Sequence, residues 1–459
     1  MELKIDNIGA ISNADIELDG ITVIAGINNK GKSTVGKILY ALLHDMYDWE
    51  KTYQDIRADK IYSFLTEQSI ILEDYCMANS GAKRRRTGKV NQLSRRYSVN
   101  EDFFAAIEDM QIQEGDSDLA EFLEKYAGEY FSLYFKKDEQ ILHNRYRSVI
   151  REWVGNTIQK ASSVDIDELN LQKGILRDSF NKVFNKQYRR IGTDSSKLCY
   201  TEDNRKVSIK IGEEWEMVSP LRIRARTHFV ESPRIYDILS DTRYGYVQRE
   251  YLQHLMCPNT VVEKTTFRIQ PSFDNEDAED RSKRFAKILE QLTETVQGQA
   301  DFHQKVGLEF KDERIAKPIH AANVSTGVKA LALLEYAIRI GAIRENDILI
   351  LDEPEINLHP EWQVIYARAL VHLQKEFNIR ILLTTHSPFF IRAIECYTDI
   401  ENQMGRLNVY KAATDSNGDG VTFENLSYSE FGMTSLYDDL SAPLNDLEDL
   451  LEKETADDV

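Results

Sequence analysis

The segment GINNKGKS, residues 26–33, follows an apolar run and precedes a stretch of helical periodicity. Its spacing, Gly26 and then Gly31-Lys32-Ser33 four residues later, is that of a loop whose backbone N–H groups surround a polyphosphate at a helix N-terminus. Glycine lets the backbone curl without a Cβ clash. A lysine here can reach the terminal phosphates, and the serine hydroxyl can ligate Mg²⁺. An ordinary strand-to-helix turn is the alternative, and the flanking strand and helix favour the phosphate loop.

Two carboxylates end a second apolar run, residues 348–351. If this run is a central strand, Asp352 lies beside the phosphate loop and binds Mg²⁺ directly, through Ser33 or through water. Glu353 is then placed to orient and polarise an attacking water. Carboxylates at the tip of a buried strand are costly unless a cation or hydrogen bonds compensate. The alternative is that both residues only cap the following turn.

A histidine ends a third apolar run, in IRILLTTHSP. At the end of a buried strand, His386 can hydrogen-bond the γ-phosphate and the attacking water, and so report whether ATP or ADP is present. Taken alone, a histidine in this position is more often structural. The two motifs before it favour the sensor role.

Ser325 and Gly327 open the amphipathic segment NVSTGVKALALLEYAI. A serine with a glycine at a helix N-terminus forms an anion site from free N–H groups and the helix dipole. The alternative is a plain N-cap, and the two residues alone favour it.

Short apolar strands that alternate with helices carry these motifs, which is typical of a parallel sheet covered on both faces. We therefore predict an α/β fold with a mixed, mainly parallel sheet flanked by helices. Helical periodicity without sustained heptads indicates a compact inserted subdomain and not a coiled-coil arm. The predicted domains are a split head over 1–45 and 200–400, a helical insertion over 46–199, and a strand pair with an acidic helix over 401–459.

Composition narrows the classes of protein. The chain has 459 residues, 42% of them hydrophobic, and a net charge of −19, which opposes nonspecific adhesion to DNA or anionic membrane. No apolar run approaches the ~20 residues of a membrane span, and the N-terminus lacks a signal-peptide profile, so we expect a cytoplasmic protein without a membrane partner. Its four cysteines are scattered without C-x-x-C spacing, which favours reduced packing residues over a disulfide framework or zinc site.

One basic run departs from this acidic background. Residues 83–96, KRRRTGKVNQLSRR, contain no acidic residue. Such a run can contact nucleic-acid phosphates, or it can be a solvated loop or a surface that meets the acidic tail of a neighbour. No aromatic stacking pattern accompanies it.

Together, GINNKGKS, STGVK, ILILDEPEINLHP and LLTTHSP resemble the ABC-type ATPases of the SMC/RecF/Rad50 kind. The resemblance covers roughly residues 1–45 and 205–400, and it is closest to OLD-like (AAA15 or AAA_21 type) ATPases, which are common in bacterial anti-phage systems. It implies a P-loop NTPase with an ABC-type head and with ATP and Mg²⁺ as cofactors. It assigns nucleotide binding to Gly26, Asn28, Asn29, Lys30, Gly31, Lys32, Ser33, Thr34, Ser325 and Gly327.

The same resemblance implies roles for the other motifs. Asp352 and Ser33 would hold the metal, and the catalytic residues would be Glu353, His386 and Lys32. Residues 357–359 would be the D-loop. Glu231 and Ser232 occupy the region expected for the Q-loop, whose glutamine we do not place.

In this family ATP is sandwiched between two heads, which implies a homodimer or higher homo-oligomer. Ser325 and Gly327 would be the signature that completes the partner's site. Val328 departs from the polar residue usual there.

The chain contains no TOPRIM-like or other nuclease motif, so any nuclease or toxin activity would come from a separate effector protein. We expect an ATPase sensor or scaffold of a multi-protein, anti-phage defence complex. The alternatives are a RecF/Rad50-like ATPase of DNA repair or maintenance that contacts DNA through residues 83–96, and a nucleotide-gated interaction protein with negligible turnover.

Overall fold

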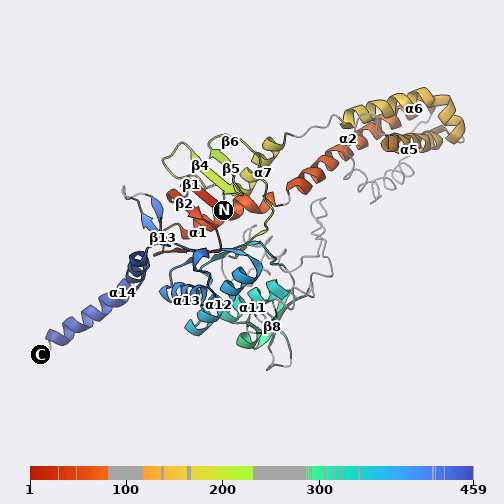
Figure 1. The fold of residues 1–459 in the computed structure, drawn as a ribbon. Helices are drawn as coiled ribbons and strands as arrows, with labels where there is room; N and C mark the ends of the chain where they lie inside the picture. Colours follow the sequence, from red (N-terminus) through yellow and green to blue (C-terminus); the bar gives the residue numbers. More distant parts are fainter. Residues whose placement is uncertain are drawn as a thin grey trace. The chain divides into compact units, whose positions relative to one another are not determined.

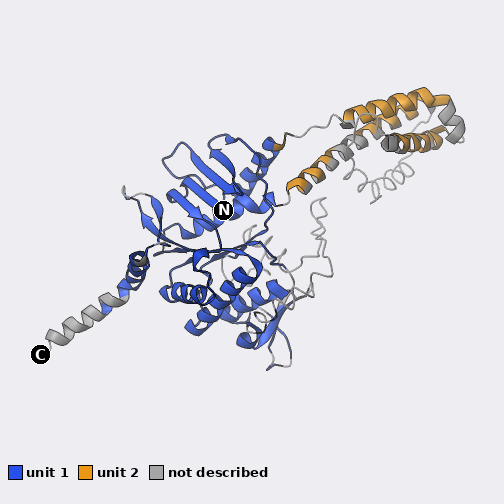
Figure 2. Cartoon of the chain, in the orientation of Figure 1, with its two compact units in different colours: residues 1–47, 169–459 blue, residues 48–168 orange. Residues whose placement is uncertain are grey.

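The computed structural model describes most of the chain, in two compact units (Figure 2). One unit is Met1–Tyr47 with Leu169–Val459, and the other is Asp48–Glu168. The residues described are 1–28, 30–47, 49–80, 117–135, 139–162, 167–230, 286, 288, 290, 292–303, 307–312, 314–315, 317–320, 323–339, 342–415, 418, 420–427 and 429–457. Asn29, the basic run 83–96, Glu231 and Ser232 therefore lie outside the described residues.

A mixed sheet is the framework of the larger unit (Figure 1). Within the described residues its order is β6-β5-β4-β1-β2-β14-β13-β3-β12-β11-β7. The strands β13, β3, β12, β11 and β7 pair in parallel, whereas β1, β2, β4, β5 and β6 pair antiparallel. Their bounds are β1 (Glu2–Ile8), β2 (Ile11–Glu17), β3 (Ile21–Ala25), β4 (Ser196–Glu202), β5 (Arg205–Ile211), β6 (Trp215–Met217), β7 (Thr227–Val230), β11 (Ile348–Asp352), β12 (Arg380–Thr385), β13 (Leu407–Thr414) and β14 (Val421–Asn425).

Helices cover both faces of the parallel strands, which is why β3 and β11 are buried along their whole length. Leu349, Leu351 and Leu383 lie in one core with the helices of one face, whereas Ile350 points to Gly36 of the helix on the other face. The first group is α11 (Thr326–Arg339), α12 (Pro360–Phe377) and α13 (Pro388–Ile400); the helix on the other face is α1 (Lys32–Leu43). The predicted α/β class, with a mixed sheet flanked by helices, is confirmed.

Three further strands form a small antiparallel sheet, in the order β10-β9-β8. It consists of β8 (Gly298–His303), β9 (Gly307–Asp312) and β10 (Ile319–His320). Among the residues that the structure describes, η1 (His44–Met46) and η3 (Met404–Arg406) are short 3-10 helices.

The C-terminal residues contribute to the central sheet. β13 pairs in parallel with β3 and antiparallel with β14, so the strand pair predicted within 401–459 is part of the same sheet as the phosphate loop. The helix α14 (Glu430–Asp457) follows it and contains Pro443.

The smaller unit is helical, with α2 (Trp49–Ser80), α5 (Ser117–Phe135) and α6 (Glu139–Ser162). Its core is aromatic: the Phe131 ring lies 6.1 Å from Tyr75 and 5.0 Å from Tyr146, centroid to centroid. The unit ends at Glu168, whereas we predicted an insertion over 46–199.

The difference arises at α7 (Glu168–Val183) and at β4. From Leu169 onward both belong to the larger unit. Gln172 of α7 holds the backbone of Leu221, since its side-chain amide donates to the Leu221 carbonyl at 3.1 Å and accepts from the Leu221 N–H at 2.8 Å.

Within the described residues, no helix is both long enough and apolar enough to span a membrane.

We expect Gly20→Ala to destabilise the larger unit. Gly20, which leads into β3, has φ +67°, and an added Cβ would lie 2.1 Å from the carbonyl oxygen of Arg406. The left-handed backbone costs about 1–2 kcal/mol for a residue with a Cβ, and overpacking adds about 1–3 kcal/mol. Gly192→Ala is the matched control, since φ is +84° there but no atom lies within 4 Å. Urea unfolding should show the larger loss for Gly20→Ala, and equal losses would contradict the packing argument.

Candidate functional site

The predicted phosphate loop connects the end of β3 to the start of α1. Two of its glycines have backbone angles that favour glycine, φ +146° at Gly26 and φ +62° at Gly31. A Cβ on Gly26 would also lie 3.2 Å from the carbonyl oxygen of Ala412, on the neighbouring strand β13. The loop therefore depends on glycine for its curvature and for its close approach to β13.

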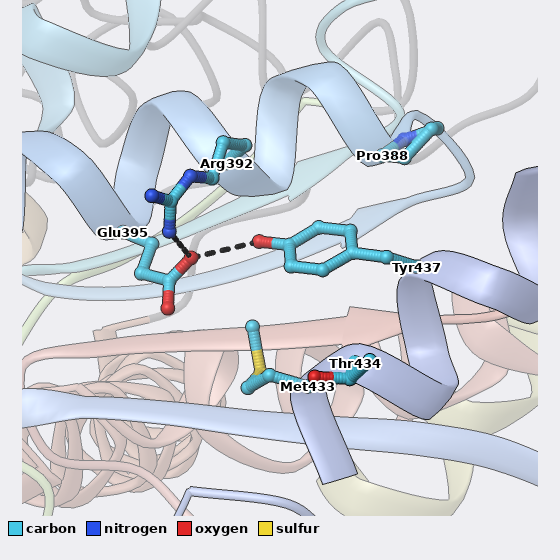
Figure 3. A pocket seen from close by; sticks show the side chains of 6 residues that line it. All are labelled: Pro388, Arg392, Glu395, Met433, Thr434 and Tyr437. Carbon is cyan, nitrogen blue, oxygen red and sulfur yellow. Dashed lines mark hydrogen bonds and ion pairs between the residues drawn. The ribbon is translucent and has the colours of Figure 1, made fainter. Parts of the chain in front are cut away.

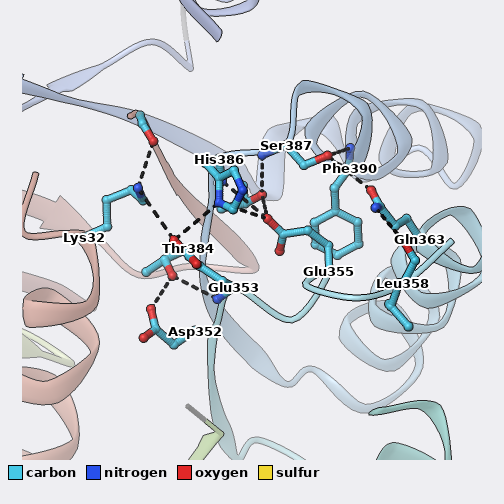
Figure 4. A network of polar contacts seen from close by, with 12 residues as sticks. Lys32, Asp352, Glu353, Glu355, Leu358, Gln363, Thr384, His386, Ser387 and Phe390 are labelled. Carbon is cyan, nitrogen blue, oxygen red and sulfur yellow. Dashed lines mark hydrogen bonds and ion pairs between the residues drawn. The ribbon is translucent and has the colours of Figure 1, made fainter. Parts of the chain in front are cut away.

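Lys32 turns its ammonium back over this loop (Figure 4). Its Nζ donates to the carbonyl oxygens of Gly26 at 2.8 Å and Ile27 at 3.0 Å, and lies 3.8 Å from Oε1 of Glu353. The side chain is only 4% exposed, and burial lowers the pKa of the ammonium while nearby carboxylates, Glu353 first, oppose that shift. The cation is thus held at the site before any ligand arrives.

Three parallel strands end together beside Lys32. Asp352 of β11 is opposite Thr384 of β12, and Thr384 is opposite Ile24 of β3. Thr385, the last residue of β12, is opposite Ala25, the last residue of β3. The parallel register therefore brings together the phosphate loop, the paired carboxylates and the segment that leads to His386.

Thr384 connects the two carboxylate residues. Its hydroxyl donates to Oδ1 of Asp352 at 2.5 Å and accepts from the backbone N–H of Glu353 at 3.1 Å. Glu353 has φ +48°, a backbone conformation that residues with a Cβ rarely adopt. The hydrogen bonds that the Glu353 N–H donates to the hydroxyl and the carbonyl oxygen of Thr384 support this strained backbone.

His386 lies beside the carboxylate of Glu353. Its Nδ1 is 3.4 Å from Oε1 of Glu353 and 4.0 Å from Oε1 of Glu355. The next residue, Ser387, caps α13, because its hydroxyl accepts from the N–H of Phe390 at 3.2 Å. Lys32, Glu353 and His386, all predicted to be catalytic, are thus brought together, while their roles stay predictions.

Glu355 also belongs to this cluster, and our sequence reading did not identify it. Its side chain is 3% exposed, and its Oε1 accepts from the hydroxyl of Thr385 and from the N–H of His386 at 3.4 Å. Burial raises the pKa of this carboxyl group, and the bond from Thr385 opposes the shift. The available signal was a second glutamate in DEPE, two residues after the first, in a turn that follows a buried strand.

The donor atoms at this edge of the sheet fit a magnesium ion. Ser33, in the first turn of α1, supplies a hydroxyl oxygen, and Asp352 supplies carboxylate oxygens. Mg²⁺ prefers oxygen ligands and is usually bound by one or two protein groups together with substrate phosphates and water. The assignment of Mg²⁺ to Ser33 and Asp352 stays a prediction.

The other residues of the predicted phosphate loop have varied surroundings. Asn28 is exposed. Lys30 Nζ donates to the hydroxyl of Thr414 on β13 at 2.5 Å, and the N–H of Thr34 donates to the Gly31 carbonyl at 3.1 Å. Lys30 thus joins the loop to β13.

Ser325 and Gly327 lie at the start of α11. The Ser325 hydroxyl accepts from the N–H of Val328 at 3.4 Å, as an N-cap does. A Cβ on Gly327 would lie 3.0 Å from the carbonyl oxygen of Asn357 and 3.3 Å from the Trp362 ring. The predicted signature therefore packs against the predicted D-loop and α12, and the N-cap explanation accounts for its local hydrogen bond.

A hollow of about 490 Å³ lies between α13 and α14 (Figure 3). Glu395 bridges the two helices, because its Oε2 accepts from the hydroxyl of Tyr437 at 2.9 Å and lies 2.7 Å from Nη1 of Arg392. Burial and this bond raise the pKa of Tyr437. The helix that follows His386 is thus anchored to the C-terminal helix.

Comparisons with known proteins point to one family. The AAA_15 family model, described as AAA ATPase domain, matches residues 1–391. A search of curated proteins gave no match.

Several solved structures of SMC heads resemble the chain. An SMC head bound to the C-winged helix domain of ScpA aligns with a TM-score of 0.42 and 11% identity, over 94% of this chain and 98% of that chain. The SMC head domain from Thermotoga maritima aligns with a TM-score of 0.36 and 9% identity, over 92% and 97%. At these TM-scores the likeness leaves function to be argued from the site.

We expect Thr384→Val to weaken the site, because it removes the hydroxyl that donates to Oδ1 of Asp352 and accepts from the Glu353 N–H. That N–H keeps its bond to the Thr384 carbonyl at 3.1 Å, so the main loss is the bond to the Asp352 carboxylate, and a hydrogen bond to a charged group contributes about 1.5–3 kcal/mol. Urea unfolding without nucleotide should show that loss, and calorimetric titration should show weaker Mg²⁺-dependent ATP binding. Thr384→Ser keeps the hydroxyl and should stay close to wild type. If Thr384→Ser were as damaged as Thr384→Val, the loss would come from the methyl group and not from the hydrogen bonds.

Proposed function

Because the chain belongs to the AAA_15 family of AAA ATPase domains, we propose that it is a Mg²⁺-dependent ATP hydrolase with its active site around Lys32. One observation carries the proposal: a buried ammonium, a histidine and paired carboxylates meet where a glycine loop opens a helix. Lys32 Nζ is 3.8 Å, and His386 Nδ1 is 3.4 Å, from the same oxygen of Glu353. This combination fits a polyphosphate with a water beside its terminal phosphorus.

In this proposal each residue has a separate task. The Lys32 ammonium exchanges its bonds to the loop carbonyls for bonds to the β- and γ-phosphates. Ser33 and Asp352 would hold Mg²⁺, which would neutralise charge on the phosphates. The Glu353 carboxylate orients the water and accepts its hydrogen bond, and His386 contacts the γ-phosphate and that water. In this proposal the strained backbone of Glu353 keeps its carboxylate facing the attacking water.

We also propose that the active unit is a pair of heads. The support is the sequence resemblance, together with the position of Ser325, which is exposed at the N-terminus of α11. Free N–H groups at a helix N-terminus favour an anion, so this end could meet a nucleotide held by a second copy. Ser325 and Gly327 would then act in the partner's site.

Beyond hydrolysis, we propose an ATPase sensor or scaffold in a multi-protein defence complex with a separate effector. The support is the sequence resemblance to OLD-like ATPases. The alternative is a DNA-maintenance role, which the basic run 83–96 would support by contacting DNA phosphates. Isolation of the native complex separates the two. A co-purifying nuclease or toxin with little DNA affinity supports the defence role, whereas salt-dependent DNA binding that is lost when Arg84, Arg85 and Arg86 are neutralised supports the alternative.

We expect Glu353→Gln to lose at least ~100-fold in turnover, as removal of a general base does, while it still binds ATP. Lys32→Ala should lose ATP binding itself, because the phosphates lose their buried cation. Steady-state hydrolysis and calorimetric titration of the two variants check this pair of outcomes. Full turnover in Lys32→Ala would refute the site. Unchanged turnover in Glu353→Gln would favour a nucleotide-gated binder.

Sedimentation velocity tests the paired heads. Glu353→Gln traps bound ATP, so with Mg²⁺ and ATP it should sediment as a dimer or larger species. Adding Ser325→Arg, which puts a bulky side chain at the start of α11, should shift the sample toward monomer. Monomers under every condition would contradict the sandwich arrangement.

A further inference from the structure

The second glutamate of DEPE, Glu355, is buried beside the proposed active site. A purely structural role does not explain why a charged side chain is buried there. The Glu355 side chain is 3% exposed, and Oε2 has no hydrogen-bond partner among the described residues. Its other oxygen, Oε1, accepts from Thr385 and from the His386 N–H. Burying a carboxylate with unused bonding capacity is costly, and such groups concentrate at functional sites.

The ring of His386 has two unlike edges. Its Nδ1 is buried and without a hydrogen-bond partner among the described residues, although the side chain as a whole is 41% exposed. The exposed edge must therefore be the one that carries Nε2. Nδ1 faces two carboxylate oxygens, one from Glu353 and one from Glu355.

We propose that Glu355 is the positioning residue for His386, holding the ring so that a protonated Nδ1 faces the carboxylates and Nε2 faces the nucleotide side. The inference rests on the proposed function of this site and adds a residue to it. A ring nitrogen between two carboxylate oxygens is favoured as a donor, since a bare lone pair there would be repelled. The orientation of a functional histidine is commonly set by the partner of its other nitrogen.

Glu355 also fixes the backbone that carries the ring (Figure 4). The Thr385 hydroxyl donates to Glu355 and accepts from the N–H of Ser387 at 3.0 Å. The N–H of His386 points to the same carboxylate. The Glu355 carboxylate thus bonds to both Thr385 and His386. Thr385 in turn bonds to the N–H of Ser387, so the backbone on both sides of His386 is held.

The experiment is ¹⁵N NMR of ring-labelled histidines in the full-length, nucleotide-free protein, with His386 assigned by the signal missing in His386→Gln. Glu355→Gln keeps the shape of the side chain and removes its charge. Glu424→Gln is the matched control, because Glu424 is an exposed glutamate on β14. In wild type and control, the His386 spectrum should show Nδ1 protonated. In Glu355→Gln it should shift toward the Nε2–H tautomer or to averaged values.

Kinetics give a second readout. Loss of a group that orients a ligand typically costs about 10–100-fold, so kcat of Glu355→Gln should fall by that factor while KM for ATP changes less than about threefold. In the His386→Gln background, Glu355→Gln should cause little further loss, because the residue acts through the histidine. A purely structural residue would leave the His386 signals in place and would give losses that multiply.

The outcomes remain separable from those of the proposed function. If wild type fails to hydrolyse ATP, the proposed function falls, while the nucleotide-free NMR still decides the role of Glu355. If Glu355→Gln does not fold, Thr385→Val removes one of its two donors and should move the same signals part of the way. His386 signals that match wild type in every folded variant would overturn the inference.

Discussion

The site depends on the parallel pairing of β3, β12 and β11. Because parallel strands share their carboxyl ends, a phosphate loop after β3 and paired carboxylates after β11 meet at one edge, with β12 between them. A one-residue slip of β11 would exchange the faces of Leu349, Ile350 and Leu351 and move Asp352 away from Thr384. Burial on both faces opposes that slip, so the hydrophobic core fixes the geometry of the polar site.

Polar groups then refine what the register brings together. The Thr384 hydroxyl bonds to Asp352 and to the Glu353 N–H, and the Thr385 hydroxyl bonds to Glu355 and to the Ser387 N–H. Two adjacent hydroxyl groups therefore contact three acidic residues. The buried Lys32 provides the opposite charge near Glu353. Such a network is stable only when its members are satisfied. Within the described residues, Oε2 of Glu355 and Nδ1 of His386 have no hydrogen-bond partner. Both atoms belong to the edge of the sheet that we propose to be catalytic.

Local patterns in the sequence predicted the elements better than their partners. The apolar runs before Gly26, Asp352 and His386 indicate buried strands, and those strands form with their ends aligned. The position of β13 beside β3 was not predictable, because alternation marks a strand but does not say which neighbour it pairs with. The predicted end of the insertion differs from the observed one for a similar reason. Helical periodicity identifies α7 as a helix, but it does not show that Gln172 of α7 bonds to Leu221 in the larger unit.

Glu355 was missed on different grounds. Its role depends on depth and on contacts with Thr385 and His386, which are about 30 positions away in the chain. A charged residue in a turn reads as exposed from sequence alone, since most glutamates are. Only the folded arrangement distinguishes this buried glutamate from a solvated one.

In our proposal the ends of β3, β12 and β11 form one site for a magnesium–triphosphate. The most direct measurement is a crystal structure of the protein with Mg²⁺ and a non-hydrolysable ATP analogue. We expect a γ-phosphate in contact with Lys32 Nζ, the metal on Ser33 and Asp352, and Glu353 facing the γ-phosphorus. A nucleotide bound elsewhere, or one whose triphosphate does not contact Lys32, would contradict it.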